Sequence, residues 1–131
     1  MARKFLSAVG IAYVGLGLWC AAMPRISSEA VGFKLQPGQG QSEFLTVYGG
    51  LEVSLGLVFL WPVCRREDLA IPLRTCLLIH AGLVVFRTLG FISYSGFETT
   101  TYALAATEWV IFVTATGLSI SQRRSDGQPI E

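Results

Sequence analysis

The chain has 131 residues and a formal net charge of +1. It is 52% hydrophobic and only 15% charged, with a mean hydropathy of +0.54. Soluble domains usually carry about 25% charged residues, so this composition indicates a membrane protein. It excludes a nucleic-acid-binding protein, which needs a clustered basic excess, and a disordered chain, which would be polar and highly charged.

Four apolar runs have about the 20-residue length that a helix needs to cross a bilayer. They cover residues 5–22, 44–63, 71–92 and 101–120 and leave no stretch long enough for a separate soluble domain. Because the runs are continuous and do not alternate apolar with polar residues, helices are favoured over barrel strands. The sequence predicts an all-α fold, an integral membrane four-helix bundle, with residues 1–131 forming a single membrane domain.

Positive charges outside the spans are divided unequally between the two sides of the membrane. Arg25 and Lys34 fall on one side, and the remaining basic residues outside or at the edge of a span fall on the other. Cytoplasmic segments carry the excess of Lys and Arg, so we expect a multi-pass protein of the bacterial inner membrane with both termini in the cytoplasm. The first span also imitates a signal peptide, but its apolar run is longer than usual, and we expect it to remain uncleaved.

Three charged residues stand inside the spans at a common depth. At about 1.5 Å per residue, Glu52 lies about 12 Å, Glu108 about 10 Å and Arg87 about 8 Å from the outer end of its span. A charge at the bilayer centre costs about 2.5 to 3.5 kcal/mol and normally has a partner in the bundle interior. The five donors of arginine suit two carboxylates, so we predict a buried Glu52–Arg87–Glu108 triad that links spans two, three and four.

Three further polar residues are candidates for the same interior. Tyr48 stands four residues before Glu52, a spacing at which its hydroxyl could donate to the carboxylate. His80 stands seven residues before Arg87, about 10 Å closer to the cytoplasm. Glu43, just before the second span, is a secondary candidate for reaching Arg87. We expect a ligand-binding or buried polar cluster, with no catalytic group and no metal-binding motif such as C-x-x-C.

Small residues are frequent in the spans, where they let helices approach closely in lipid. We expect Gly82, Gly90 and the Gly50-x-x-x-Ser54 step to pack within the bundle, although a homodimer seam would look the same. The polar, glycine-containing segment 27–43 on the outer side is predicted to form an irregular cap.

The charged interior leaves several functions open, and the residues name no cofactor and no enzymatic activity. We favour a structural or binding module that holds a small polar ligand or a lipid headgroup. A carboxylate-rich chamber with a histidine below it would also suit a proton-coupled small transporter. Redox chemistry is a further alternative. The expected partners are the lipid bilayer and a small polar ligand or lipid headgroup, with a homodimer left open; nucleic acid is not expected.

The second span opens with the stretch Glu43-Phe44-Leu45-Thr46-Val47-Tyr48-Gly49-Gly50-Leu51-Glu52. This stretch resembles the E-F-x-x-V-Y-G-G-L-E signature of a family of small bacterial four-span membrane proteins of uncharacterised function. The similarity covers roughly residues 5–120 and includes Arg87-Thr88-Leu89-Gly90 and Glu108. It implies a four-helix membrane fold but no reaction. A looser similarity to DoxX-like proteins, some of them associated with quinol or thiosulfate oxidation, implies a quinone-linked redox accessory subunit or enzyme as the alternative.

Overall fold

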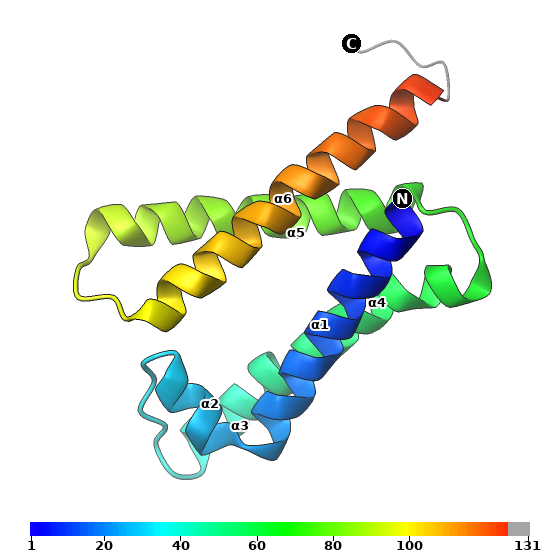
Figure 1. Ribbon diagram of the computed structural model, residues 1–131. Coiled ribbons are helices and arrows are strands. Elements are labelled where there is room, and N and C mark those ends of the chain that lie inside the picture. The colour runs from blue at the N-terminus through cyan, green and yellow to red at the C-terminus, as the bar shows by residue number, and fades with distance from the viewer. Residues whose placement is uncertain (126–131) are drawn as a thin grey trace. The chain divides into compact units, whose positions relative to one another are not determined.

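The computed structural model describes residues 1–125 and the side chains of residues 1–122, and every regular element in this range is a helix (Figure 1). Four helices are long and apolar enough to span a membrane, and they cover Ala2–Ala22, Gln39–Arg65, Ala70–Ser93 and Thr99–Gln122. Each predicted span lies inside one of them, so the all-α, four-span fold is confirmed. The side chains of Arg123 and Arg124, which contribute to the predicted orientation, lie outside the described ones.

The described chain divides into two compact units. The N-terminal unit is Arg3–Glu67, and the C-terminal unit is Met1–Ala2 with the chain from Asp68 onward. In chain order the elements are α1 (Ala2–Ala22), α2 (Pro24–Ala30), α3 (Gln39–Phe44), the π-helix η1 (Leu45–Leu51), α4 (Glu52–Arg65), α5 (Ala70–Ser93) and α6 (Thr99–Ser125).

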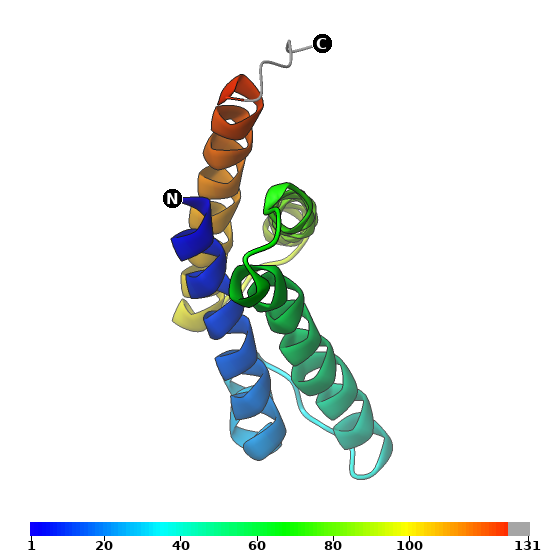
Figure 2. The same cartoon turned by 90° about the vertical axis from the view of Figure 1, so that its right-hand side faces the viewer.

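In the N-terminal unit, α1 lies beside η1 and α4 (Figures 1 and 2), and glycines set their distance. A Cβ added at Gly56 would lie 2.7 Å from the carbonyl oxygen of Gly10. A Cβ at Gly17 would lie 2.8 Å from the carbonyl oxygen of Gly49. Real Cβ atoms do not approach oxygen so closely, so only glycine permits this contact, as in other membrane helix pairs.

The predicted Gly50-x-x-x-Ser54 step does not take part in this packing. A Cβ at Gly50 would meet no atom within 4 Å, and Ser54 is exposed, with its hydroxyl donating to the Gly50 carbonyl oxygen at 2.8 Å. Within the N-terminal unit the glycine that is buried is the neighbouring Gly49, and a homodimer seam at the exposed Gly50 step stays a prediction.

The segment between the first two spans is more regular than the predicted irregular cap. It contains α2 and the start of α3. At the end of α2, the Gly32 N–H donates to the Glu29 carbonyl and the Phe33 N–H donates to the Ser28 carbonyl, at 3.0 and 2.9 Å. These two bonds make a Schellman motif, in which Gly32 adopts a φ of 81°. The prediction was wrong because a polar composition does not reveal short helices that end at a glycine cap.

Phe33 leaves this motif and contacts two aromatic side chains of the second span. Its ring centroid lies 6.4 Å from that of Phe44 and 5.6 Å from that of Tyr48, both in edge-on geometry. Phe44 and Tyr48 stack on each other at 4.7 Å. The segment between the first two spans, called the outer segment after its predicted side, is therefore attached to the second span by an aromatic cluster.

The second span ends at a left-handed residue. Arg66 has a φ of 57°, the Glu67 N–H donates to the Pro62 carbonyl at 3.0 Å, and the Arg66 N–H donates to the Val63 carbonyl at 3.4 Å. This is a second Schellman motif, with arginine where glycine is usual. The N-terminal end of α1 is bound to the same turn, because Arg3 Nη1 donates to the Val63 carbonyl oxygen at 2.6 Å.

The C-terminal unit is a hairpin in which α5 packs against α6 (Figure 1). A short connection joins the two helices and contains Gly96 at a φ of 82°. Aromatic rings close this end: Phe91 lies 4.9 Å from Phe97 and stacks on Tyr102 at 5.5 Å. The hairpin brings the last turns of α5 to the first turns of α6, and the candidate site lies there.

Candidate functional site

Arg87 on α5 and Glu108 on α6 form an ion pair at the centre of the candidate site. Arg87 Nε donates to Glu108 Oε2 at 3.0 Å, and Arg87 Nη2 donates to Oε1 at 2.5 Å. The arginine side chain is 30% exposed and the glutamate side chain 12% exposed. Two parallel bonds from one guanidinium fix the orientation of the carboxylate as well as its position. This contact is one of the two that the predicted triad requires.

The depth argument accounts for this pair. Arg87 lies about 9 Å along α5 from its last residue, Ser93, and Glu108 lies about 14 Å along α6 from its first residue, Thr99. Both charges are therefore more than one turn inside a helix of membrane-spanning length. At that depth each has a neighbour of opposite charge, which offsets the cost of placing it there.

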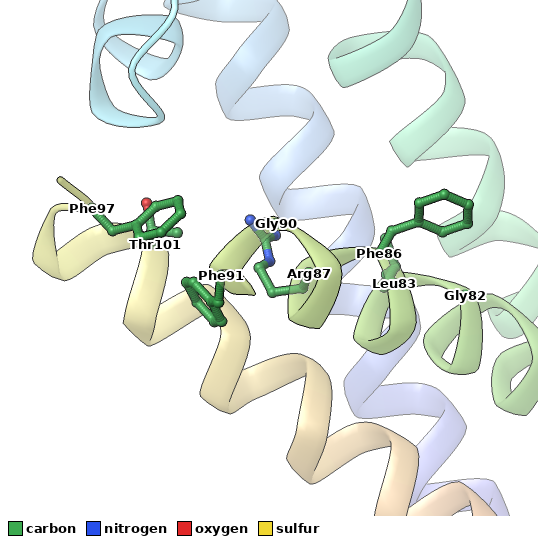
Figure 3. Close-up of a pocket in the computed structure, with 8 residues that line it drawn as sticks. All are labelled: Gly82, Leu83, Phe86, Arg87, Gly90, Phe91, Phe97 and Thr101. Carbon is green, nitrogen blue, oxygen red and sulfur yellow. The ribbon is translucent and has the colours of Figure 1, made fainter. Parts of the chain in front are cut away.

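A pocket of about 440 Å³ opens beside the ion pair (Figure 3). Arg87 is its one charged lining residue, and Thr101 is its one hydroxyl-bearing residue. The other lining residues are glycine or apolar, namely Gly82, Leu83, Phe86, Gly90, Phe91 and Phe97. In Figure 3, Phe97 and Thr101 lie together at one end, whereas the Phe86 ring points away from Arg87. The pocket thus combines one polar point with a mainly apolar wall.

Gly82 and Gly90 line this pocket, and within the C-terminal unit neither packs closely against another helix. A Cβ added at either residue would meet no atom within 4 Å. Small residues in a membrane helix create either close contacts or space, and the sequence pattern alone does not distinguish the two. The pocket residues Phe91, Phe97 and Thr101 were not among the predicted site residues. The sequence does contain a feature that could have indicated them, namely aromatic side chains on both sides of a very short connection between two spans.

Glu52 belongs to the N-terminal unit, so its predicted place beside Arg87 stays a prediction. It is the first residue of α4 and follows the π-helix η1 directly. Its Oε2 atom is buried and has no hydrogen-bond partner among the described residues. A carboxylate oxygen in that environment carries a desolvation cost that no described contact offsets.

Oε2 of Glu52 has no hydrogen-bond partner in the described part of the chain, and a bond from the Tyr48 hydroxyl to the other oxygen of this carboxylate stays a prediction. Tyr48 lies within η1, where the backbone repeats at i→i+5 and no longer at i→i+4. The wider turn changes the relative direction of residues four apart. The Tyr48 ring stacks on Phe44, in the aromatic cluster that holds the outer segment.

The two remaining predicted residues differ in burial. His80 is 1% exposed on α5, and its Nδ1 donates to the Cys76 carbonyl oxygen at 2.9 Å. Cys76 is fully buried, with its Sγ 3.7 Å from the same nitrogen. Glu43 is exposed on α3. The structure gives His80 a local backbone partner and leaves the predicted role of Glu43 untested.

The comparisons with known proteins add no family to these observations. No protein-family model, curated protein or solved structure matches the chain. The interpretation of the site therefore depends on its own chemistry. Among the residues that the structure describes, no group of three His, Cys, Asp or Glu side chains could hold a metal ion.

Proposed function

We propose that this chain is a membrane protein that binds the polar end of a lipid-like molecule in the pocket between α5 and α6. One observation carries the proposal: a partly exposed arginine, already paired with a glutamate, lines a mainly apolar pocket within helices of membrane-spanning length. Ligand pockets commonly have this composition, with a few polar groups that orient a mainly apolar molecule.

The charge of the pocket favours an uncharged polar group as the ligand's head. Glu108 offsets the charge of Arg87, so the pair attracts a further anion weakly. The N–H groups of Arg87 nevertheless polarise an oxygen acceptor strongly in a site with little water. We therefore expect an ester, a hydroxyl or a carbonyl oxygen near Arg87, with hydrocarbon against Leu83 and Phe91.

The aromatic lining favours a quinone as a second candidate. Phe91 and Phe97 line the pocket with their rings 4.9 Å apart, and an aromatic wall suits a flat ring whose carbonyl oxygen accepts from arginine. This candidate agrees with the looser resemblance to DoxX-like proteins. It would make the chain a quinone-linked redox accessory subunit or enzyme.

We further propose that the protein lies in the bacterial inner membrane with both termini in the cytoplasm. The four apolar helices and the unequal division of Lys and Arg support this orientation. Alkaline phosphatase inserted after Gln36 should be active, and a fluorescent protein fused to the C-terminus should fluoresce. An inactive phosphatase together with a dark fusion would reverse the orientation.

Filling the pocket without touching the ion pair tests the binding proposal. Gly90→Leu places a side chain into space where a Cβ meets nothing, and Gly117→Leu does the same on α6 at a residue that does not line the pocket. Each protein would be extracted with its native lipid, and the bound molecules would be identified by native mass spectrometry.

We expect wild type and Gly117→Leu to retain a lipid or a quinone in a fixed ratio to protein. Gly90→Leu should retain at least tenfold less bound lipid or quinone per protein, because a filled pocket excludes the ligand. A retained quinone would favour the redox candidate, and a retained lipid would favour the first. Equal retention by the two variants, with equal thermal stability, would contradict the proposal.

A further inference from the structure

A second pocket, of about 250 Å³, lies in the segment between the first two spans. Its lining comes from α2, the turn after it and α3, namely Pro24, Arg25, Ser28, Glu29, Phe33, Lys34, Leu35 and Gln41. Since α1 ends at Ala22 and the next spanning helix begins at Gln39, residues 23–38 lie at the boundary between bilayer and water. A pocket in this segment is therefore at the level of lipid headgroups.

The charges of this pocket favour an anion. Arg25 and Lys34 are cationic, and Glu29 pairs with Arg25, with 3.6 Å between Nε and Oε1. One positive charge, that of Lys34, remains uncompensated within the lining. The volume is below that of a pocket for a drug-sized molecule, so it suits a compact anionic group.

The distribution of basic residues along the chain singles out the same pair. Arg25 and Lys34 are the two basic residues expected on the outer side of the membrane, the side on which Lys and Arg are normally infrequent. Both line this one pocket. Two disfavoured charges that meet in one cavity suggest a shared binding partner more than a shared effect on orientation.

Local structure positions these side chains. The Schellman motif at Gly32 fixes the direction in which Phe33 and Lys34 leave α2. Phe33 is held by the rings of Phe44 and Tyr48 and is still 42% exposed. Gln41 Oε1 accepts from the Gly38 N–H at 3.2 Å, which fixes the other side of the pocket. The backbone on both sides of the pocket and the Phe33 ring are therefore held in place without a ligand, whereas the side chains of Arg25 and Lys34 are exposed and reach into solvent.

We propose that this pocket binds a phosphate group, with Lys34 supplying the uncompensated charge and Arg25 a second donor. The apolar side chains of Phe33 and Leu35 would contact the carbon atoms next to the phosphate. Phosphate at this level of the membrane comes from an anionic phospholipid or from a soluble phosphate compound. This site is separate from the pocket of α5 and α6, and neither proposal depends on the other's ligand.

The test uses the full chain in nanodiscs of phosphatidylcholine that contain a minor fraction of phosphatidylglycerol. Native mass spectrometry would count the phosphatidylglycerol that stays bound after release from the disc. A parallel arm would measure the thermal stability of delipidated protein in detergent as inorganic phosphate is added, with sulfate as a control for ionic strength. The variants would be Lys34→Gln, Lys34→Arg and, as a matched loss of one exposed cation in the same unit, Arg66→Gln.

We expect Lys34→Gln to retain about tenfold less phosphatidylglycerol than wild type, because a charge-assisted hydrogen bond is lost. Lys34→Arg and Arg66→Gln should retain it. A further outcome is that inorganic phosphate stabilises wild type but not Lys34→Gln while wild type retains no phosphatidylglycerol. That result would assign the site to a soluble phosphate compound. Equal retention and an equal phosphate response in wild type and Lys34→Gln would overturn the proposal. Thermal unfolding of each variant shows that the fold is intact.

Discussion

A side chain on Gly10 would collide with the backbone of Gly56, and a side chain on Gly56 would collide with the backbone of Gly10. A Cβ on Gly10 would lie 2.9 Å from the Gly56 carbonyl oxygen, and a Cβ on Gly56 would lie 2.7 Å from the Gly10 carbonyl oxygen. The contact is reciprocal and involves backbone atoms, which cannot move aside as a flexible side chain does. Seven residues further along α1 the contact is one-sided: a Cβ on Gly17 would lie 2.8 Å from the Gly49 carbonyl oxygen, whereas a Cβ on Gly49 would lie 3.4 Å from the Ala21 Cβ.

Adding one methyl group at this contact should destabilise the protein. A Cβ at Gly17 would lie 2.8 Å from the Gly49 carbonyl oxygen and from the Val53 nitrogen. We expect Gly17→Ala to lower the free energy of unfolding by about 1 to 3 kcal/mol. Gly15→Ala, on the same helix, adds its methyl group where no atom lies within 4 Å, and should raise that free energy by up to about 1 kcal/mol. Thermal unfolding in detergent would compare them, and equal melting temperatures would contradict the proposed packing.

Removing one partner of the Arg87–Glu108 pair should cost more than removing both. Arg87→Leu leaves the Glu108 carboxylate without its partner on α5 and should lower the free energy of unfolding by about 3 to 5 kcal/mol. Arg87→Leu/Glu108→Leu leaves no charge and should be more stable than Arg87→Leu alone. Leu89→Ala, at a 50% exposed residue of the same helix, should change stability by under about 1 kcal/mol. A double variant less stable than Arg87→Leu would show that the pair does not act as a unit.

Arg66 is the one described non-glycine residue with a positive φ, and replacing it should stabilise the chain. Its left-handed conformation costs an ordinary residue about 1 kcal/mol or more, which glycine avoids. We expect Arg66→Gly to raise the free energy of unfolding by about 1 kcal/mol. Arg65→Gly removes the same charge from the last turn of α4 and should lower it by a similar amount. Denaturant titration would measure both, and a loss of stability in Arg66→Gly would contradict the strain argument.

Phe44 should be the most sensitive member of the aromatic cluster. It is 3% exposed and stacks on Tyr48, so Phe44→Ala should lower the free energy of unfolding by about 3 to 5 kcal/mol. Val47→Ala, at a 43% exposed residue of η1, should have an effect of under about 1 kcal/mol. Faster hydrogen exchange of residues 31–38 in Phe44→Ala would show that the cluster holds the outer segment. Unchanged hydrogen exchange would show that the aromatic cluster does not hold residues 31–38 in place.

The sequence predicted the features that depend on length, charge and depth. Four apolar runs correspond to four helices, because a bilayer admits few other structures. The pairing of Arg87 with Glu108 followed from their similar predicted depth and opposite charge. Neither prediction required knowledge of which side of a helix a residue faces.

The π-helix η1 changes the helical phase on which two predictions depended. A π-turn changes the angle between successive residues, so the four-residue spacing argument for Tyr48 and Glu52 does not apply there, and the glycine of this segment that packs against α1 is Gly49. No residue type in Leu45–Leu51 marks a π-helix. The pocket at Gly82 and Gly90 was missed for a different reason, because a glycine indicates a small side chain and not what lies next to it.

The division of the described chain into two units bears on how the protein is made. The glycine contacts and the aromatic cluster of the N-terminal unit join residues within 3–67. Synthesis proceeds from the N-terminus, so every one of these residues has been translated before α5 begins. Once Glu67 has left the ribosome, the first helical hairpin can thus form its glycine contacts and its aromatic cluster without any residue of α5 or α6.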